Sequence, residues 1–120
     1  MEELKIKDLR VGNMVSFTDF PALNNTIVLN RSHLYNERFV ESFCKPIPLN
    51  EEWLVKFGFT QQGRFFNKEA KHNLFVWYEN HIGIKGMLGV VKPSKCIYVH
   101  QLQNLYFALT QKELTIKWKN

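Results

Sequence analysis

Few side chains in this chain of 120 residues could do chemistry, and those few are spaced far apart. The chain has 4 histidines and 2 cysteines, and no CxxC or Cys/His grouping gives them the spacing of a zinc site. These residues are His33, His72, His81, His100, Cys44 and Cys96. No carboxylate pair and no nucleophile beside a base supplies the parts of a catalytic mechanism. The sequence therefore predicts a protein without catalytic, cofactor-binding or metal-binding residues.

Three glycines in the second half of the chain could suggest a phosphate-binding loop. Gly83, Gly86 and Gly89 recur at every third residue. However, no helix-opening run follows them, and no Lys-Ser or Lys-Thr pair completes such a loop. Hairpin turns and a bulge explain these glycines better.

The positive charge of the chain lies in its last third. Residues 1–84 balance ten basic against ten acidic side chains, so the formal net charge of +5 belongs to residues 85–120. The lysines of that segment are Lys85, Lys92, Lys95, Lys112, Lys117 and Lys119. A basic face attracts phosphate, but lysines also keep small proteins soluble, and planar recognition of phosphates and bases favours arginine. We favour the interpretation that these lysines form a solvated surface, and we keep anion binding as the alternative.

The first element that could position a site is a short helix over residues about 50–57. Asn50 can cap its N-terminus, and Glu51 and Glu52 suit the positive end of the helix dipole. Gly58 can take the left-handed conformation that ends a helix, and Phe59 then folds back on the last turns. This pattern predicts a helix that packs on a core.

A second helix is predicted over residues about 98–109. One stripe contains Tyr98, Leu102, Leu105 and Leu109, widened by Val99, Tyr106 and Phe107. Its polar side contains His100, Gln101, Gln103 and Asn104. A stripe this broad favours a helix that lies across a sheet or another helix. We expect His100 to be half exposed and hydrogen-bonded to a backbone carbonyl.

Between and before the helices the chain reads as short strands. The clearest is residues 74–78, and others are predicted at residues 14–17, 26–29, 38–43, 64–66, 82–84, 88–91 and 114–118. Together the elements predict an α+β fold in which two main helices pack on an antiparallel, partly barrel-like sheet. No linker or internal repeat divides the chain, so we expect a single domain over residues 1–120.

Three stretches of the chain resemble a known family. They are Lys45 to Phe59, with its PIPLxEEWLxKFGF pattern, Tyr98 to Ile116, with its YVHQLQNLYFALTxxELTI pattern, and the opening Ile6 to Val15. The family comprises small uncharacterised proteins of Bacteroides-type phages, prophages and mobile elements. Gln111 departs from it, because a glycine commonly follows the second helix there. The resemblance implies a viral or mobile-element setting and no particular activity.

The remaining sequence properties limit where in the cell we expect the protein to act. No apolar run reaches the roughly 20 residues that span a bilayer, and the acidic, mixed start Met1–Lys5 is unlike a secretory signal. Cys44 and Cys96 could pair, but two buried free thiols in a reducing compartment is the simpler interpretation. We therefore expect a cytoplasmic protein of the host cell that does not associate with membranes.

Three functional hypotheses follow from these observations. The first is a non-enzymatic interaction module of a phage or mobile element, which binds a host or viral protein through spare aromatic side chains. Aromatic residues make up 14% of the chain, enough to leave some for a surface. The alternative is binding of a nucleic acid or nucleotide signal through the basic C-terminal third. An enzyme ranks last, because no catalytic set is visible.

Overall fold

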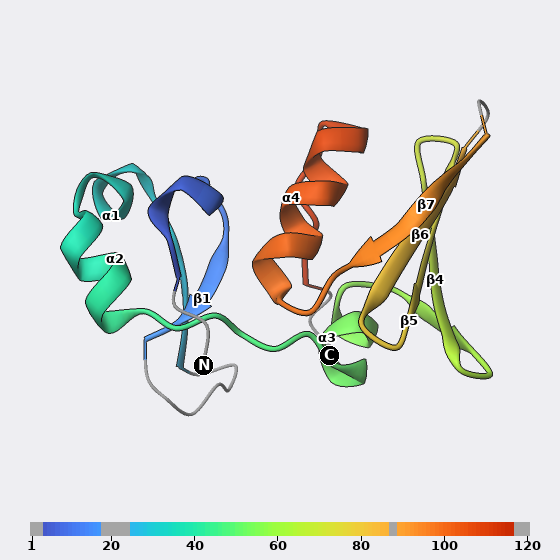
Figure 1. The fold of residues 1–120 in the computed structure, drawn as a ribbon, viewed down its shortest axis with the longest axis horizontal. Coiled ribbons are helices and arrows are strands. Elements are labelled where there is room, and N and C mark those ends of the chain that lie inside the picture. The colour runs from blue at the N-terminus through green and yellow to red at the C-terminus, as the bar shows by residue number, and fades with distance from the viewer. Residues whose placement is uncertain (1–3, 18–24, 87–88, 117–120) are drawn as a thin grey trace.

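Two hydrophobic cores, one on each side of strand β1 (Met14–Ser16), organise the fold. The computed structural model describes residues 4–17, 25–86 and 89–116. The N-terminal lobe, residues 4–44, contains η1 (Ile6–Asp8), β1, β2 (Thr26–Val28), α1 (Arg31–Tyr35) and α2 (Glu37–Phe43). The C-terminal lobe, residues 49–116, contains α3 (Glu51–Lys56), β3 (Thr60–Gln62), β4 (Phe65–Ala70), β5 (Asn73–Tyr78), β6 (His81–Gly86), β7 (Gly89–Lys95) and α4 (Val99–Thr110). The lobes lie side by side and are joined by residues 45–48 (Figure 1).

Strand β1 separates the two cores because successive strand side chains point to opposite faces. Met14 belongs to the core of the C-terminal lobe, and Val15 belongs to the smaller core of the N-terminal lobe. The buried members of the smaller core are Leu4, Val15, Leu29, Val40 and Cys44. One short strand therefore contributes to the packing of both lobes.

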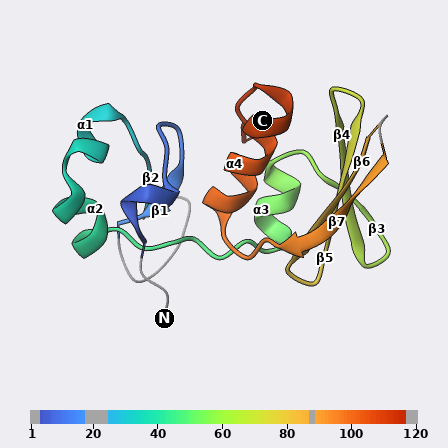
Figure 2. The ribbon, with the colours of Figure 1, turned by 45° about the horizontal axis from the view of Figure 1, so that its top comes forward.

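The C-terminal lobe is a five-stranded antiparallel sheet in the order β3-β4-β5-β6-β7, with its helices on one face. The inner face carries Phe66, Phe75, Trp77, Ile82 and Ile84, all buried. Helices α3 and α4 lie on the same side of this sheet (Figure 2). The sheet does not close into a barrel, and a register shift at Ile82/Ile84 marks a bulge between β6 and β7. The predicted α+β fold with two helices packed on an antiparallel sheet is confirmed.

Helix α3 has the ends that its sequence predicts. The Asn50 side chain accepts a hydrogen bond from the backbone N–H of Trp53 at 3.0 Å. At the other end, Gly58 has φ +92°, and the N–H of Phe59 donates to the carbonyl of Leu54 at 3.0 Å. A bond from Gly58 N–H to the carbonyl of Val55 completes a Schellman motif. Trp53, Leu54 and Phe59 are all buried in the larger core.

Helix α4 lies between the lobes, and this position corrects two expectations. Leu102 and Tyr106 pack on the sheet side, as predicted, but Leu109 is 39% exposed. On the predicted polar side, His100 and Gln103 are 6% and 1% exposed. His100 is therefore buried rather than half exposed. The reason is that the N-terminal lobe covers the polar face of α4, which a search for one apolar stripe does not reveal.

Polar contacts hold the N-terminal lobe against α4. The buried Gln103 side chain accepts from the N–H of Met14 at 2.8 Å and donates to the carbonyl of Gly12 at 3.0 Å. The Arg10 guanidinium forms a salt bridge with Glu113, donates to the carbonyl of Gln103 and lies 4.4 Å from the ring centroid of Phe107. We call this set of contacts the inter-lobe seam.

Two predicted strands are wrong or fall partly outside the described residues. Residues 38–43 are helical, because Asn36 accepts from the N–H of Phe39 at 3.1 Å and opens α2. Phe39, Val40 and Phe43 also have the spacing of a helix face. Residues 114–116 follow α4 without regular structure, and residues 117 and 118 lie outside the described range. The predicted strands of the main sheet and of β1 and β2 are present, with boundaries shifted by a few residues.

Candidate functional site

The most exposed aromatic side chains of the described residues lie on the α1–α2 helix pair. Each short helix begins at an asparagine whose side chain caps it, Asn30 for α1 and Asn36 for α2. The cap of α1 is reciprocal: Asn30 Oδ1 accepts from His33 N–H at 3.0 Å, and His33 Nδ1 accepts from Asn30 N–H at 3.0 Å. The caps at both N-termini stabilise two helices that are too short to be stable alone.

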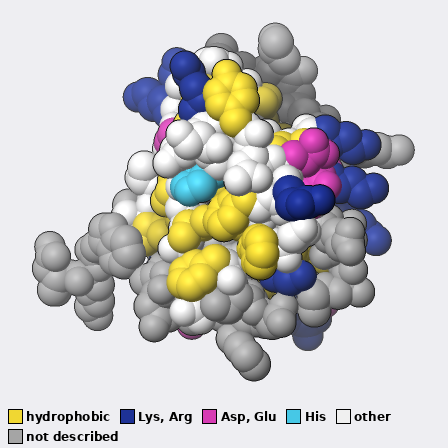
Figure 3. Space-filling model, turned by 90° about the vertical axis from the view of Figure 1, so that its left-hand side faces the viewer, with side chains coloured by type: hydrophobic (Ala, Val, Ile, Leu, Met, Phe, Trp, Pro, Cys, Tyr) yellow, Lys and Arg dark blue, Asp and Glu magenta, His cyan; other side chains and the backbone are white. Residues whose placement is uncertain are grey.

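These helices carry a run of rings at their surface. The His33 and Phe39 rings stack at 5.7 Å, and the Phe39 and Phe43 rings lie 6.1 Å apart. Phe43 is 63% exposed, and Tyr35, at the end of α1, is 84% exposed. We call His33, Tyr35, Phe39 and Phe43 the aromatic patch. Seen from this end of the molecule, hydrophobic side chains gather around a histidine (Figure 3).

The aromatic patch has the composition of a protein-binding surface. Tyrosine is enriched among the residues that dominate binding energies, and aromatic residues in general are enriched in interfaces. Large apolar side chains that a fold leaves together in water are typical of interaction sites. Phe39 is half-buried against the small core, so the patch is anchored on a packed element.

The sequence did not point to these residues as a site. The strand predicted at residues 38–43 would have put Phe39 and Phe43 on one face of a sheet. Aromatic side chains are common on a sheet face and do not indicate a binding site there. The available signal was the repeated asparagine, Asn30 three residues before His33 and Asn36 three residues before Phe39, which fits two N-caps.

The lysines proposed for anion binding lie in different places. Lys85 and Lys95 are exposed on the outer face of the sheet, because Lys85 is four residues after His81 in β6 and Lys95 pairs with His81. Lys112 follows α4, which covers the opposite face. The side chain of Lys92 and all of Lys117 and Lys119 lie outside the described residues.

Lys85 has other basic neighbours that the charge count did not suggest. It lines a shallow hollow together with Lys71 and His72, which form the turn between β4 and β5. Glu69 lies in the same hollow and opposes the charge of the two lysines. The described part of the chain thus brings Lys85 toward the β4–β5 turn, and Lys112 lies apart from it.

The cysteines and histidines do not form a chemical cluster within the described residues. Cys44 is buried in the core of the N-terminal lobe and Cys96 in that of the C-terminal lobe, and both are free thiols. Burial raises the pKa of Cys96 to about 12 and also raises the pKa of Cys44, so both thiols stay protonated near neutral pH. No group of three or more His, Cys, Asp or Glu in the described ranges could hold a metal ion.

Comparison with known proteins gives no match: no family model fits the chain, and no curated protein or solved structure is significantly similar to it. The resemblance to a phage and mobile-element family therefore stays a prediction. Among the described helices, none has the length and apolar character needed to cross a membrane.

Proposed function

We propose that this protein is a non-enzymatic interaction module that binds a partner protein through the aromatic patch on α1 and α2. The observation that supports this proposal is the exposure of Phe43, 63%, in the run of rings that it forms with Phe39 and His33, together with the 84% exposure of Tyr35 at the end of α1. A partner that covered these rings would remove a large apolar area from water. The family resemblance suggests that the partner is a host or viral protein in the cytoplasm.

The patch can be altered without disturbing either core. Tyr35 and Phe43 are exposed, whereas neighbouring Val40 is fully buried. Tyr35→Ala and Phe43→Ala should therefore leave the free energy of unfolding within about 0.5 kcal/mol of wild type. A matched control is Val55→Ala, which removes an apolar side chain that is 55% exposed on α3, away from the patch.

The test is affinity capture from host lysate followed by binding measurements with the purified partner. Tyr35→Ala and Phe43→Ala should each weaken binding by about tenfold or more, the size of a hot-spot loss, and Val55→Ala should change it less than about twofold. If wild-type protein retains no partner that the two patch variants lose, the proposal is wrong.

Anion binding is the second candidate, and the grouping of Lys85 with Lys71 and His72 favours it. Under this proposal the ligand is a nucleic acid or a nucleotide. Retention on a duplex DNA column should fall steeply with salt, and Lys85→Glu should reduce it while Lys112→Glu, beyond α4, should not. Equal effects of the two variants would indicate nonspecific attraction to net positive charge and would contradict a site at Lys85.

A further inference from the structure

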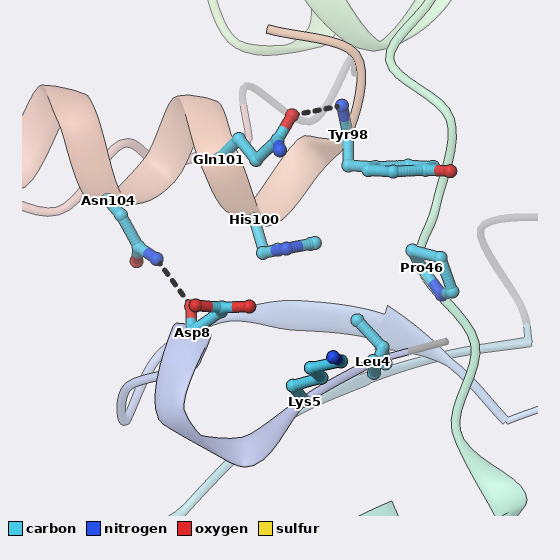
Figure 4. A pocket seen from close by; sticks show the side chains of 8 residues that line it. All are labelled: Leu4, Lys5, Asp8, Pro46, Tyr98, His100, Gln101 and Asn104. Carbon is cyan, nitrogen blue, oxygen red and sulfur yellow. Dashed lines mark hydrogen bonds between the residues drawn. The ribbon is translucent and has the colours of Figure 1, made fainter. Parts of the chain in front are cut away.

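A cavity of about 320 Å³ lies between the two lobes at the start of α4. One wall is η1 with the residues before it, the other is the first turns of α4, and Pro46 of the connecting segment closes one side (Figure 4). The residues that line it are Leu4, Lys5, Asp8, Pro46, Tyr98, His100, Gln101 and Asn104. Its volume is at the lower limit of known ligand cavities, so it suits a molecule much smaller than a nucleotide cofactor.

Hydrogen bonds fix both walls of this cavity. The Gln101 side-chain oxygen accepts from the N–H groups of Ile97 and Tyr98, at 2.9 and 3.1 Å, and thereby caps α4. The Asn104 amide donates to the carbonyl of Asp8 at 3.0 Å and accepts from the Asn13 side chain at 2.7 Å. Gln101 and Asn104 therefore set the shape of the cavity, and the Gln101 oxygen and both polar atoms of the Asn104 amide are already hydrogen-bonded.

Two charged groups of the cavity remain available. Among the described residues, neither the Lys5 ammonium nor the Asp8 carboxylate forms an ion pair or a side-chain hydrogen bond. The Asp8 carboxylate points into the space between the walls, and the Lys5 side chain lies on the same wall beside Leu4 (Figure 4). Arg10, a few residues later, is by contrast engaged by Glu113.

The rest of the lining is apolar or aromatic. The Tyr98 and His100 rings are nearly parallel, with an interplanar angle of 10° and centroids 5.8 Å apart, and His100 is 6% exposed. Leu4 and Pro46 are buried beside them. The cavity thus combines one cationic group, one anionic group and an apolar surface.

We infer that this cavity binds a small zwitterion, a free amino acid, with its ammonium at the Asp8 carboxylate and its carboxylate at the Lys5 ammonium. One charge of each sign on a single wall matches the two charges of such a ligand, whereas a simple anion would be repelled by Asp8. The amino-acid side chain lies against Tyr98, Pro46 and Leu4. This site is separate from the aromatic patch.

The experiment titrates the full chain with the twenty proteinogenic amino acids and follows amide chemical shifts by NMR. The best binder is then compared with its N-acetyl derivative, which lacks the positive charge, and with its methyl ester, which lacks the negative charge. Each derivative should bind about tenfold to a hundredfold more weakly, the size of a lost charge-assisted hydrogen bond.

Two charge-removing variants assign the ends of the ligand. Asp8→Asn should weaken binding of the free amino acid by about tenfold or more and abolish the discrimination against the N-acetyl derivative. Lys5→Met should weaken binding of the free amino acid by a similar factor and abolish the discrimination against the methyl ester. Lys7→Met is the matched control, because Lys7 is exposed in η1, two residues after Lys5, and does not line the cavity. Comparing the free amino acid with its two derivatives within each variant separates the effect of the lost charge from the effect of the added bulk.

Four results would overturn the inference. The first three are no binding of any amino acid at millimolar concentration, equal weakening by Lys5→Met and Lys7→Met, and unchanged discrimination in Asp8→Asn. Binding of inorganic phosphate that is insensitive to Asp8→Asn would likewise identify a simple anion site instead. Phe43→Ala, which alters the aromatic patch, should leave amino-acid binding unchanged, so failure of the partner-binding proposal is distinguishable from failure here.

Discussion

Gln111 ends α4 in a backbone conformation that ordinarily belongs to glycine. It has φ +60° and ψ +21°, and its N–H donates to the carbonyl of Phe107 at 2.8 Å. The same geometric demand is met by a glycine at the end of α3, where Gly58 has φ +92°. A left-handed residue with a Cβ costs about 1–2 kcal/mol.

Gln111→Gly should therefore stabilise the protein. We expect the free energy of unfolding to rise by about 0.5–1 kcal/mol, because relief of the left-handed conformation exceeds the added freedom of the unfolded chain. Urea unfolding measures the change. Lys112→Gly is the control at the next exposed position and should not stabilise. A loss of stability in Gln111→Gly would show that its conformation costs nothing here.

The buried thiol of Cys96 predicts a loss of stability at alkaline pH. Burial raises its pKa from the ordinary 9.0 to about 12. Below pH 9 the thiol is protonated in both the folded and the unfolded chain, so its stabilising effect is fully present there. Between 9 and 12 the unfolded chain loses this proton and the folded chain keeps it, so the free energy of unfolding falls as pH rises.

Cys96→Val, which has no titrating group, should reduce this pH dependence. From about pH 8 to about pH 10.5, wild type should lose about 2 kcal/mol more than the variant, measured by urea unfolding at both pH values. Burial also raises the pKa of Cys44 and of Tyr106, but both groups remain in the variant and cancel in the comparison. Parallel losses in the two proteins would mean that Cys96 ionises without unfolding.

At the scale of elements, α4 is a helix with two buried faces of different chemistry. Val99, Leu102 and Tyr106 pack into the larger core. Gln103, on another face, hydrogen-bonds the backbone at the start of β1 and just before it. Because the Gln103 side chain satisfies a buried donor and a buried acceptor of the N-terminal lobe, α4 specifies where that lobe sits.

Gln103→Leu should be strongly destabilising although leucine is the better helix former and the site is buried. The Met14 N–H and the Gly12 carbonyl would lose their partners, and each unsatisfied buried group costs about 1–3 kcal/mol. We expect a loss of about 2–5 kcal/mol in the free energy of unfolding. Leu109→Gln, an exposed position on the same helix, is the control and should change stability by less than about 0.5 kcal/mol. A neutral Gln103→Leu would show that the seam is not held by this side chain.

At the scale of the whole molecule, the two lobes have separate cores but share β1, α4 and the inter-lobe seam. The single-domain prediction requires that they unfold together. The chain carries its own probes for this question, because Cys44 lies in the core of the N-terminal lobe and Cys96 in that of the C-terminal lobe.

Both thiols should become reactive at the same urea concentration. Labelling with a thiol reagent, followed by peptide mass spectrometry, measures each cysteine separately. In Arg10→Met, which removes the salt bridge to Glu113 and the contact with Phe107, Cys44 should react at lower urea than Cys96. Separate midpoints already in wild type would mean two independently unfolding lobes.

The sequence by itself determined the local structure of the strongest segments. Asn50, Gly58 and Phe59 define the ends of α3 because capping depends on neighbouring residues alone, and the apolar spacing of residues 98–109 predicts α4 for the same reason. The strands of the main sheet follow from short apolar runs bounded by turns. The strand predicted at residues 38–43 is wrong because its β-branched and aromatic residues suit either period, whereas the cap at Asn36 favours a helix.

Only the tertiary structure decided which faces meet. Burial of His100 and Gln103, the placement of Lys85 away from Lys112, and the cavity formed by Lys5, Asp8 and Tyr98 all depend on contacts between residues far apart in the chain. The exposure of Tyr35 and Phe43 is likewise a property of what the fold leaves uncovered. A periodic pattern shows that a face differs from its opposite but not what packs against it, so the cavity at the start of α4 and the burial of its polar face follow only from the contact between the lobes.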